Sequence, residues 1–259
     1  MEQFFFKYQG TGNDFILIDD RSNTFPKENI SLIKKLCNRR FGIGSDGLIL
    51  LQNSSSSDFK MVYFNADGNL GSLCGNGARC TVAFAKHLEC ISDKTTFEAS
   101  DGLHYARIES GIISLKMHDI HDIENFKTHS FLDTGSPHHV QIVNDLKRYN
   151  VYENGKRIRE GEPYYEAGSN VNFVEQISEN KFAIRTYERG VENETLSCGT
   201  GATAVAVAMH FNKKTTANQV VIEVEGGTLE IEFEPTVRGY QNIFLTGPAE
   251  QVYSGTLKF

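Results

Sequence analysis

The feature that most constrains this chain is a weak internal duplication, because two copies of one pattern fold into two similar units. The turn Cys74-Gly75-Asn76-Gly77-Ala78 recurs as Cys198-Gly199-Thr200-Gly201-Ala202, 124 residues later (198 − 74). Two further landmarks recur in the same order, at offsets of 123 and 125 residues: Thr11-Gly12-Asn13 as Thr134-Gly135-Ser136-Pro137, and Ser100-Asp101-Gly102 as Glu225-Gly226-Gly227. Three landmarks at nearly one offset indicate that the two halves share a fold.

Each half contains strands, then the cysteine turn, then a helix, then more strands. We predict the helices over residues 78–88 and 202–211, which are apolar on almost every side. A helix of that kind must be buried on almost every side. The strands follow from apolar and polar residues that alternate, as in 228–233. The pattern predicts a sheet wrapped around one buried helix, twice over.

The apolar alternation is interrupted near residues 118–128, where His, Asp and Glu replace it. We therefore predict an N-terminal domain over residues 1–121 with 250–259, and a C-terminal domain over residues 122–249. A chain of 259 residues is long enough for two domains of ordinary size.

Composition excludes several classes of protein. The net charge is −7 and no Lys/Arg-rich stripe occurs, which argues against a nucleic-acid partner. The apolar stretches are too short to span a membrane. Phe4-Phe5-Phe6 is followed at once by Lys7, so it is an opening strand and no signal peptide.

The five cysteines predict free thiols in a reducing cytoplasm, because their number is odd and no secretory signal precedes them. No pair has the spacing of a zinc site, so we expect no metal. Cys37, Cys80 and Cys90 lie within or just after apolar helical stretches, 29–39 among them, and are interpreted as packed residues.

Cys74 and Cys198 stand immediately before glycines that open a helix. The free N–H groups and the dipole of a helix start attract a carboxylate, and glycine allows a ligand to approach the backbone closely. The same positive end favours thiolate over thiol and lowers the pKa of a cysteine. Two such turns in duplicated halves predict a pair that converges on one ligand.

A converging pair of thiols is suited to inverting the α-carbon of an amino acid. One thiolate removes the proton from one face while a thiol delivers a proton to the opposite face. Helix starts aimed at the α-carboxylate stabilise the negative charge that develops there, so no electron-sink cofactor is required.

A series of motifs runs through essentially the whole chain: Lys7-Tyr8, Gly10, Gly12-Asn13-Asp14-Phe15, Arg40-Phe41-Gly42-Ile43-Gly44, Asp46-Gly47, Phe64-Asn65-Ala66-Asp67-Gly68, Cys74-Gly75-Asn76-Gly77-Ala78-Arg79-Cys80, Tyr187-Glu188-Arg189-Gly190, Glu194-Thr195 and Cys198-Gly199-Thr200-Gly201-Ala202. In these motifs the chain resembles the diaminopimelate epimerase family. This resemblance implies an α+β fold of two pseudo-symmetric domains, each a β-barrel-like sheet wrapped around a central helix.

The resemblance also implies the reaction, which interconverts the LL and meso forms of 2,6-diaminoheptanedioate on the route to lysine and peptidoglycan. Cys74 and Cys198 would be the acid/base residues, assisted by His138 and Glu188. The α-carboxylate would lie against the backbone at Gly75, Asn76, Gly199 and Thr200. The positions that line the substrate site are Asn13, Asn65, Asn170, Glu188 and Arg189. The family also implies a homodimer, and an enzyme without a cofactor.

The second amino-acid head of this substrate explains the charged pair Glu188-Arg189. A carboxylate is bound in a planar fork by a guanidinium, for which Arg189 is the candidate. The distal ammonium group needs oxygen acceptors, which Glu188 or amide side chains supply. Ser136 and Gly47 depart from the family, in which some members carry Asn and Gln there, and neither position is assigned a role.

Three other readings stay open at this point. A racemase of the same fold could act on histidine, proline or hydroxyproline. A thiol–disulfide oxidoreductase could use two reactive thiols, although such enzymes usually carry both within one C-x-x-C turn. A sugar- or nucleotide-binding module could use residues 10–15, although these lack the last Gly of G-x-G-x-x-G.

Overall fold

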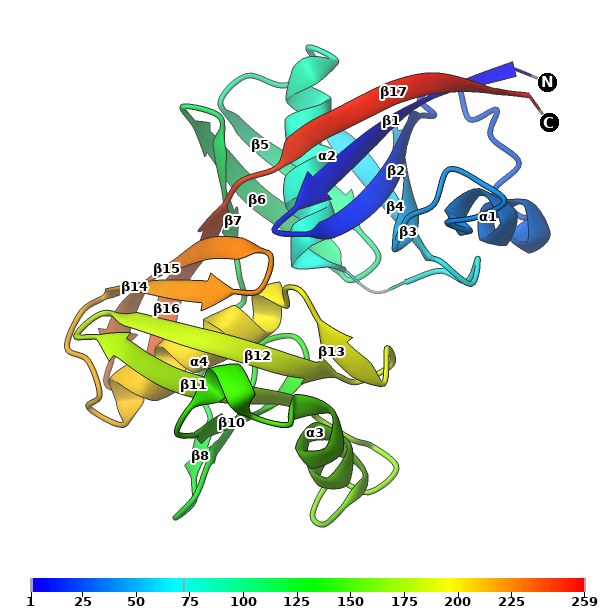
Figure 1. Ribbon diagram of the computed structural model, residues 1–259. Coiled ribbons are helices and arrows are strands. Elements are labelled where there is room, and N and C mark those ends of the chain that lie inside the picture. The colour runs from blue at the N-terminus through cyan, green and yellow to red at the C-terminus, as the bar shows by residue number, and fades with distance from the viewer. Residues whose placement is uncertain (1, 72, 259) are drawn as a thin grey trace. The chain divides into compact units, whose positions relative to one another are not determined.

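The computed structural model describes residues 2–71 and 73–258 (Figure 1). Contacts within the chain divide it into two compact units. Unit 1 contains residues 1–115 and 247–259, and unit 2 contains residues 116–246. The domain boundaries given above, at 121/122 and 249/250, stay a prediction. Within the described ranges no helix is long and apolar enough to cross a membrane.

Unit 1 is built on a sheet of eight strands. In sheet order they are β17 (Glu250–Lys258), β1 (Glu2–Gly10), β2 (Asn13–Asp19), β3 (Gly47–Gln52), β4 (Phe59–Asn65), β5 (Lys94–Ala99), β6 (Gly102–Glu109) and β7 (Ile112–Lys116). The pairs β2–β3 and β4–β5 are parallel, and the other five pairs are antiparallel. Parallel neighbours need a crossover connection, and each of the two crossovers carries a helix.

Unit 2 repeats this order of pairings. Its strands are β8 (Ile123–Asn125), β9 (Ser130–Asp133), β10 (Pro137–Ile142), β11 (Asn170–Ser178), β12 (Lys181–Glu188), β14 (Gln219–Val224), β15 (Gly227–Thr236) and β16 (Gly239–Gly247). The pairs β10–β11 and β12–β14 are parallel and the others antiparallel. A short strand β13 (Asn193–Thr195) also pairs with β12. The two halves therefore share one topology, as the duplication predicts.

The second crossover of each unit is the predicted buried helix. Helix α2 (Gly75–His87) contacts β1 to β4, and α4 (Gly199–Phe211) contacts β9 to β12, β14 and β15 (Figure 1). Nearly every residue of α4 is buried, because strands cover it on several sides. Both helices begin three residues earlier than the sequence predicted, since the glycines after each cysteine already adopt the helical conformation.

The first crossovers carry shorter elements: α1 (Ile30–Cys37) in unit 1, and a 3₁₀ turn (Leu146–Arg148) with α3 (Val151–Glu160) in unit 2. Asn29 caps α1 through Oδ1, which accepts the N–H of Leu32 at 3.0 Å. The helix predicted over 29–39 is thus confirmed, with Asn29 and Asn38 as its caps and Arg39 beyond its end.

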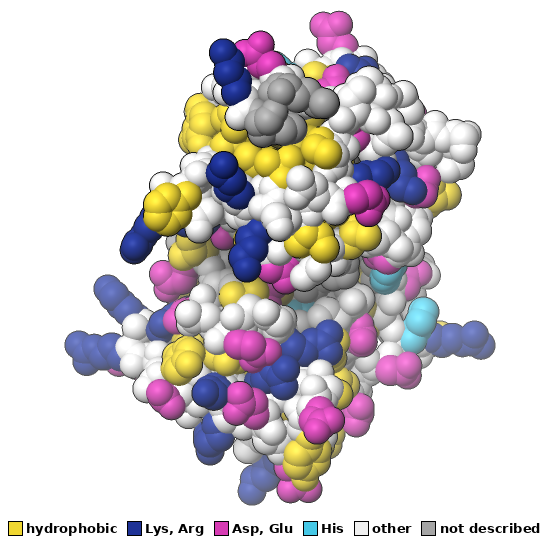
Figure 2. All heavy atoms as spheres, turned by 90° about the vertical axis from the view of Figure 1, so that its right-hand side faces the viewer, with side chains coloured by type: hydrophobic (Ala, Val, Ile, Leu, Met, Phe, Trp, Pro, Cys, Tyr) yellow, Lys and Arg dark blue, Asp and Glu magenta, His cyan; other side chains and the backbone are white. Residues whose placement is uncertain are grey.

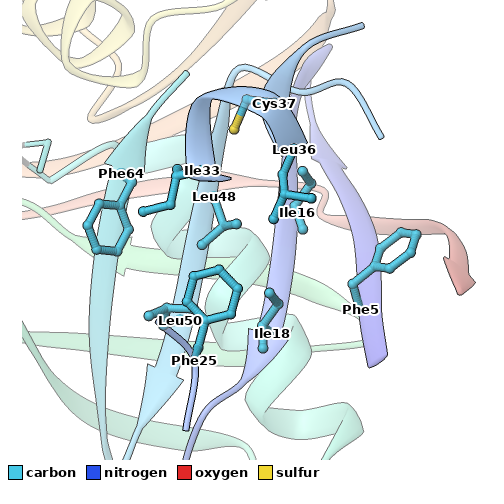
Figure 3. Packing of buried hydrophobic residues seen from close by; sticks show 10 residues of the cluster. All are labelled: Phe5, Ile16, Ile18, Phe25, Ile33, Leu36, Cys37, Leu48, Leu50 and Phe64. Carbon is cyan, nitrogen blue, oxygen red and sulfur yellow. The ribbon is translucent and has the colours of Figure 1, made fainter. Parts of the chain in front are cut away.

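Every residue of β3 is buried, because helices cover both faces of the sheet at this point. Leu48 and Leu50 pack with α1 in a cluster that includes Ile33 and Phe25, drawn in Figure 3. The intervening Ile49 faces α2, where its Cδ1 lies 3.1 Å from the position a Cβ on Gly77 would take. A strand covered on both faces reads as a continuous apolar run, which is what the sequence shows.

Leu48 provides a direct test of this packing. We expect Leu48→Ala to lower the free energy of unfolding by about 2–5 kcal/mol, because the side chain is fully buried and its loss leaves a cavity. Leu103→Ala is the matched control, since Leu103 is 60% exposed in the same unit. Urea unfolding would measure the free energy of unfolding of both variants, provided that its dependence on urea concentration stays unchanged. Equal effects of the two substitutions would contradict the assigned core.

Candidate active site

In unit 1 the predicted site residues gather at one edge of the sheet. Strand β2 begins at Asn13, β3 begins at Gly47 and β4 ends at Asn65. The register pairs Gly47 with Asn65 directly, and pairs Phe15 with Gly47 on the other side. The chain then leaves β4 and reaches Cys74, which stands directly before α2.

Unit 2 uses the equivalent edge. Strand β10 begins at Pro137, and the next residue, His138, pairs with Asn170, the first residue of β11. Strand β12 ends at Glu188, and Cys198 stands directly before α4. Each unit therefore brings its own share of the predicted residues to one place, although they are far apart in the sequence.

Both cysteines occupy the position that precedes the first helical residue. Their backbones are extended, and their carbonyl groups accept the N–H groups of Ala78 and Ala202 at 2.7 and 2.9 Å. Neither cysteine side chain caps its own helix, and neither helix has an acidic residue in its first turn. The N–H groups of these first turns are thus suited to binding an anion.

Asn13 lies against the cysteine of unit 1. Its Oδ1 is 3.5 Å from the Sγ of Cys74 and accepts from the Nδ2 of Asn76 at 3.3 Å. Its Nδ2 donates to the carboxylate of Asp46 at 2.6 Å. Because a carboxylate only accepts, Asp46 fixes the amide with its oxygen toward the thiol.

A cluster of charges supports that arrangement. Arg39 donates to both carboxylate oxygens of Asp14 at 2.9 and 2.6 Å and to Asp46 at 2.7 Å. Lys7, which is buried, pairs with Asp14 at 2.6 Å. Burial opposes ionisation of Asp14, but the hydrogen bonds from Arg39 and Lys7 outweigh it and lower its pKa to about 2. Asp14 is therefore held as a carboxylate, and Arg39 links it to Asp46.

Arg79, in the second turn of α2, is a buried cation close to Cys74. Its Nη2 donates to the Oγ1 of Thr11 at 3.3 Å and its Nε to the carbonyl of Pro248 at 3.5 Å. Among the described residues its Nη1 has no hydrogen-bond partner. Burial lowers the pKa of the guanidinium, and its interactions with Cys80 and Cys74 oppose that shift. A thiolate at Cys74 and the charge of Arg79 thus stabilise one another.

We expect Arg79→Met to reduce the thiolate fraction of Cys74, because it removes the buried positive charge. The rate at which iodoacetamide alkylates Cys74 at pH 7 should fall about tenfold, the effect of 1.36 kcal/mol on an ionisation equilibrium. Mass spectrometry of the Cys74 peptide gives this rate independently of the other thiols. Arg157→Met, on the exposed face of α3, is the control. An unchanged rate in a folded Arg79→Met protein would refute the interaction.

Cys198 is 6% exposed, and its Sγ lies 3.4 Å from the Oγ1 of Thr200. The carbonyl of Thr200 accepts from the hydroxyl of Thr134 at 3.1 Å, which holds the first turn of α4 in place. Gly201 has no space for a side chain. A Cβ there would lie 2.4 Å from the Oδ1 of Asn172 and 3.3 Å from the Sγ of Cys198. The glycine therefore lets Asn172 approach the cysteine.

His138 is completely buried beside Asn172, whose Nδ2 is 3.0 Å from the Nδ1 of the imidazole. Burial, together with the positive charge of Arg189, lowers the pKa of His138 to about 3. His138 is therefore neutral at physiological pH. His139, the next residue, has its Nδ1 2.9 Å from the hydroxyl of Tyr164.

Asn170 fixes the backbone around Arg189. Its Oδ1 accepts the N–H of Arg189 at 2.9 Å, and its Nδ2 donates to Ser136 Oγ at 2.7 Å and to the carbonyl of Pro137 at 3.2 Å. The exposed guanidinium of Arg189 donates to the carbonyl of Ala167 at 2.9 Å. Ser136, the departure from the family pattern, is thus the partner of Asn170. Glu188 is half-buried and accepts from Thr195 Oγ1 at 2.9 Å.

The remaining cysteines differ from the pair in their surroundings. Cys37 and Cys80 are buried as predicted, and burial raises the pKa of each. Cys90 is half-buried, and its Sγ lies 3.3 Å from Nη1 of Arg21. No disulfide joins any of the five cysteines, all of which lie in the described ranges.

Sequence reasoning assigned no role to four residues that shape the site: Arg39, Asp46, Arg79 and Asn172. Asn172 left one signal. It follows Asn170 by two residues, so both amides point to the same face of a strand whose first five residues are buried. Arg39 left none, because its role depends on hydrogen bonds across the sheet, and Asp46 appeared only as a member of a family motif.

The sequence model of the diaminopimelate epimerase family matches residues 5–110 and 130–252. A relative from Flavobacterium psychrophilum, named diaminopimelate epimerase, is 57% identical over 253 residues, which cover 97% of this chain and 99% of the relative. Another of that name, from Chlorobaculum tepidum, is 42% identical and covers 96% and 98%. The chain belongs to the diaminopimelate epimerase family. It is accordingly an isomerase, and the resemblance stated from the sequence is confirmed.

Solved structures with low identity share the fold. A phenazine biosynthesis protein of the PhzF family from Bacillus anthracis is 15% identical, with a TM-score of 0.81 over the whole of both chains. A hydroxyproline epimerase from Agrobacterium vitis is 13% identical, with a TM-score of 0.65 over 99% of this chain and 92% of that one. At such low sequence identity these comparisons show the fold alone. The predicted α+β class, with two similar units of sheet around helix, is confirmed.

Proposed function

We propose that this protein interconverts LL- and meso-2,6-diaminoheptanedioate, with Cys74 and Cys198 as its two acid/base residues. One observation carries the proposal. Two units of equal topology each place a cysteine directly before the first turn of a buried helix, at the same edge of the sheet. Family membership supports the choice of substrate. The role belongs to the synthesis of lysine and peptidoglycan precursors.

The proton balance needs no other reactant. The thiolate of one cysteine takes the hydrogen from the α-carbon, and the electron pair of that C–H bond stays on the substrate. The thiol of the other cysteine then gives its proton to the opposite face of the carbon. The products are an inverted α-carbon and a cysteine pair that has exchanged protonation states, so the reverse reaction can use the same groups.

The carbanion is stabilised through the α-carboxylate. The backbone N–H groups at Gly75 and Asn76, and those at Gly199 and Thr200, lie at the positive ends of α2 and α4. Negative charge that moves from the α-carbon onto the carboxylate is therefore met by fixed donors, which is the role of an oxyanion hole. We propose that this replaces an electron-sink cofactor.

The distal head of the substrate is read by the charged and amide side chains. Arg189 offers a fork to the distal carboxylate, while Glu188, Asn13 and Asn65 offer oxygen acceptors to the ammonium group. Asn170 contributes by holding the Arg189 backbone, its observed contact.

Replacement of the two cysteines tests the mechanism. We expect Cys74→Ala and Cys198→Ala each to lower the rate of inversion by at least about 10²-fold, the usual contribution of a positioned acid or base. In D₂O each variant should exchange the α-hydrogen of only one stereoisomer, because one thiol still reaches one face. Proton NMR follows both quantities. Cys90→Ala is the control and should retain full activity.

Retention of inversion by Cys74→Ala or by Cys198→Ala would contradict the two-cysteine mechanism. Exchange from both stereoisomers in a single variant would do the same, since one remaining thiol would then reach both faces.

Arg189 tests the choice of substrate. We expect Arg189→Lys to raise KM for diaminopimelate about tenfold or more, because an ammonium group cannot replace the planar fork. Wild-type protein should turn over diaminopimelate in preference to histidine, proline and hydroxyproline. Turnover of one of these three amino acids alone would favour the racemase reading instead.

We also propose that the protein acts in the cytoplasm, as a homodimer, on a small molecule and without a nucleic-acid partner. The face in Figure 2 supports the last point, because Lys and Arg side chains are interspersed with Asp and Glu and form no continuous basic stripe. Non-specific nucleic-acid binding depends on such a stripe.

A further inference from the structure

Asn172 is a completely buried amide with three polar contacts, all within unit 2. Its Nδ2 donates to the carbonyl of His139 at 3.1 Å and lies 3.0 Å from the Nδ1 of His138. Its Oδ1 accepts from the hydroxyl of Thr186 at 3.0 Å. A buried amide in so complete a set of contacts has a single orientation.

That orientation determines where His138 carries its proton. The carbonyl of His139 can only accept a hydrogen bond, so it must face the NH₂ group of Asn172. The second hydrogen of that NH₂ group then points at Nδ1 of His138. Nδ1 must present a lone pair to it, and the neutral ring therefore carries its hydrogen on Nε2.

The charged form of His138 is disfavoured for the same reason. A hydrogen on Nδ1 would be set against the N–H of Asn172, and burial together with Arg189 already lowers the pKa of the ring to about 3. The charged group that acts on this ring is Arg189, and the neighbouring titratable residue on the strand is His139. Neither supplies a carboxylate that would hold an imidazolium.

We propose that Asn172 is a positioning residue that holds His138 in the Nε2–H tautomer, so that His138 serves the reaction as a hydrogen-bond donor and not as a base. The tautomer follows from contacts within unit 2, whereas its part in the reaction rests on the proposed function. A base at this position would need its lone pair free, and Asn172 occupies it.

The N–H group expected on Nε2 is buried and has no hydrogen-bond partner among the described residues. A buried donor without an acceptor is costly, so such groups mark sites that are completed during function. The group that completes this contact during the reaction must be an acceptor, such as a thiolate. A neutral N–H donor stabilises such an acceptor through a hydrogen bond, but it cannot remove a proton from a thiol.

Nitrogen NMR of the protein with ¹⁵N-labelled histidine tests the tautomer directly. We expect the His138 ring to show a protonated Nε2 and an unprotonated Nδ1 throughout pH 6–8. Assignment uses His138→Gln, which removes one pair of signals. Finding the hydrogen on Nδ1, or a ring that becomes charged in this range, would overturn the proposal.

Two substitutions then test the consequence for the reaction. We expect Asn172→Asp, which turns a donor into an acceptor, to move the ring hydrogen to Nδ1 and to lower kcat about 10²-fold with little change in KM. Asn53→Asp, an exposed change of the same charge, is the control. His138→Gln should keep more activity than His138→Ala, because glutamine can donate but cannot act as a base.

The outcomes separate the inference from the proposed function. If the wild-type protein fails to epimerise diaminopimelate, the NMR result still decides the tautomer. If it is active and His138→Gln is no better than His138→Ala, the donor role is wrong. Should Asn172→Asp fail to fold, the wild-type spectrum still decides the tautomer. The comparison of His138→Gln with His138→Ala still decides the donor role.

Discussion

The whole arrangement depends on one constraint, which is that a helix apolar on nearly every side is stable only inside a sheet that covers it. Helices α2 and α4 meet this requirement by lying against the strands of their own units. Burial fixes the axis of each helix, and so it fixes where the first turn emerges. The first turn emerges at the sheet edge where polar side chains gather, which places the cysteine among them.

The two units place the cysteine with the same topology, but different side chains surround the thiol in each. In unit 1 an amide oxygen, fixed by Asp46 and Arg39, faces Cys74, and a buried guanidinium lies behind it. In unit 2 the hydroxyl of Thr200 and the amide of Asn172 lie near Cys198, and Asn172 in turn contacts the neutral imidazole of His138. Duplication kept the backbone and let the side chains diverge, which suits the proposed pair acting on opposite faces of an unsymmetrical substrate.

Much of this was accessible from the sequence. Alternating and continuous apolar runs give the strands and the buried helices, and the repeat of Cys-Gly-x-Gly-Ala gives both helix starts. Hydrogen-bond direction was not accessible, because it depends on which groups meet across the sheet. Asn170 was predicted to line the substrate site, yet its observed contacts hold Arg189 and Ser136. Asn172 and Asp46 were assigned no role, since an isolated Asn or Asp is typical of a turn.

The outermost strand of unit 1, β17, comes from the last residues of the chain and pairs with β1 at its beginning. Unit 2 is one continuous stretch of sequence between the two parts of unit 1. During synthesis on the ribosome, the second unit can therefore close its sheet while the first still lacks a strand. Cys74, the cysteine of the proposed pair that emerges first, thus belongs to the unit whose sheet is completed last, when β17 pairs with β1.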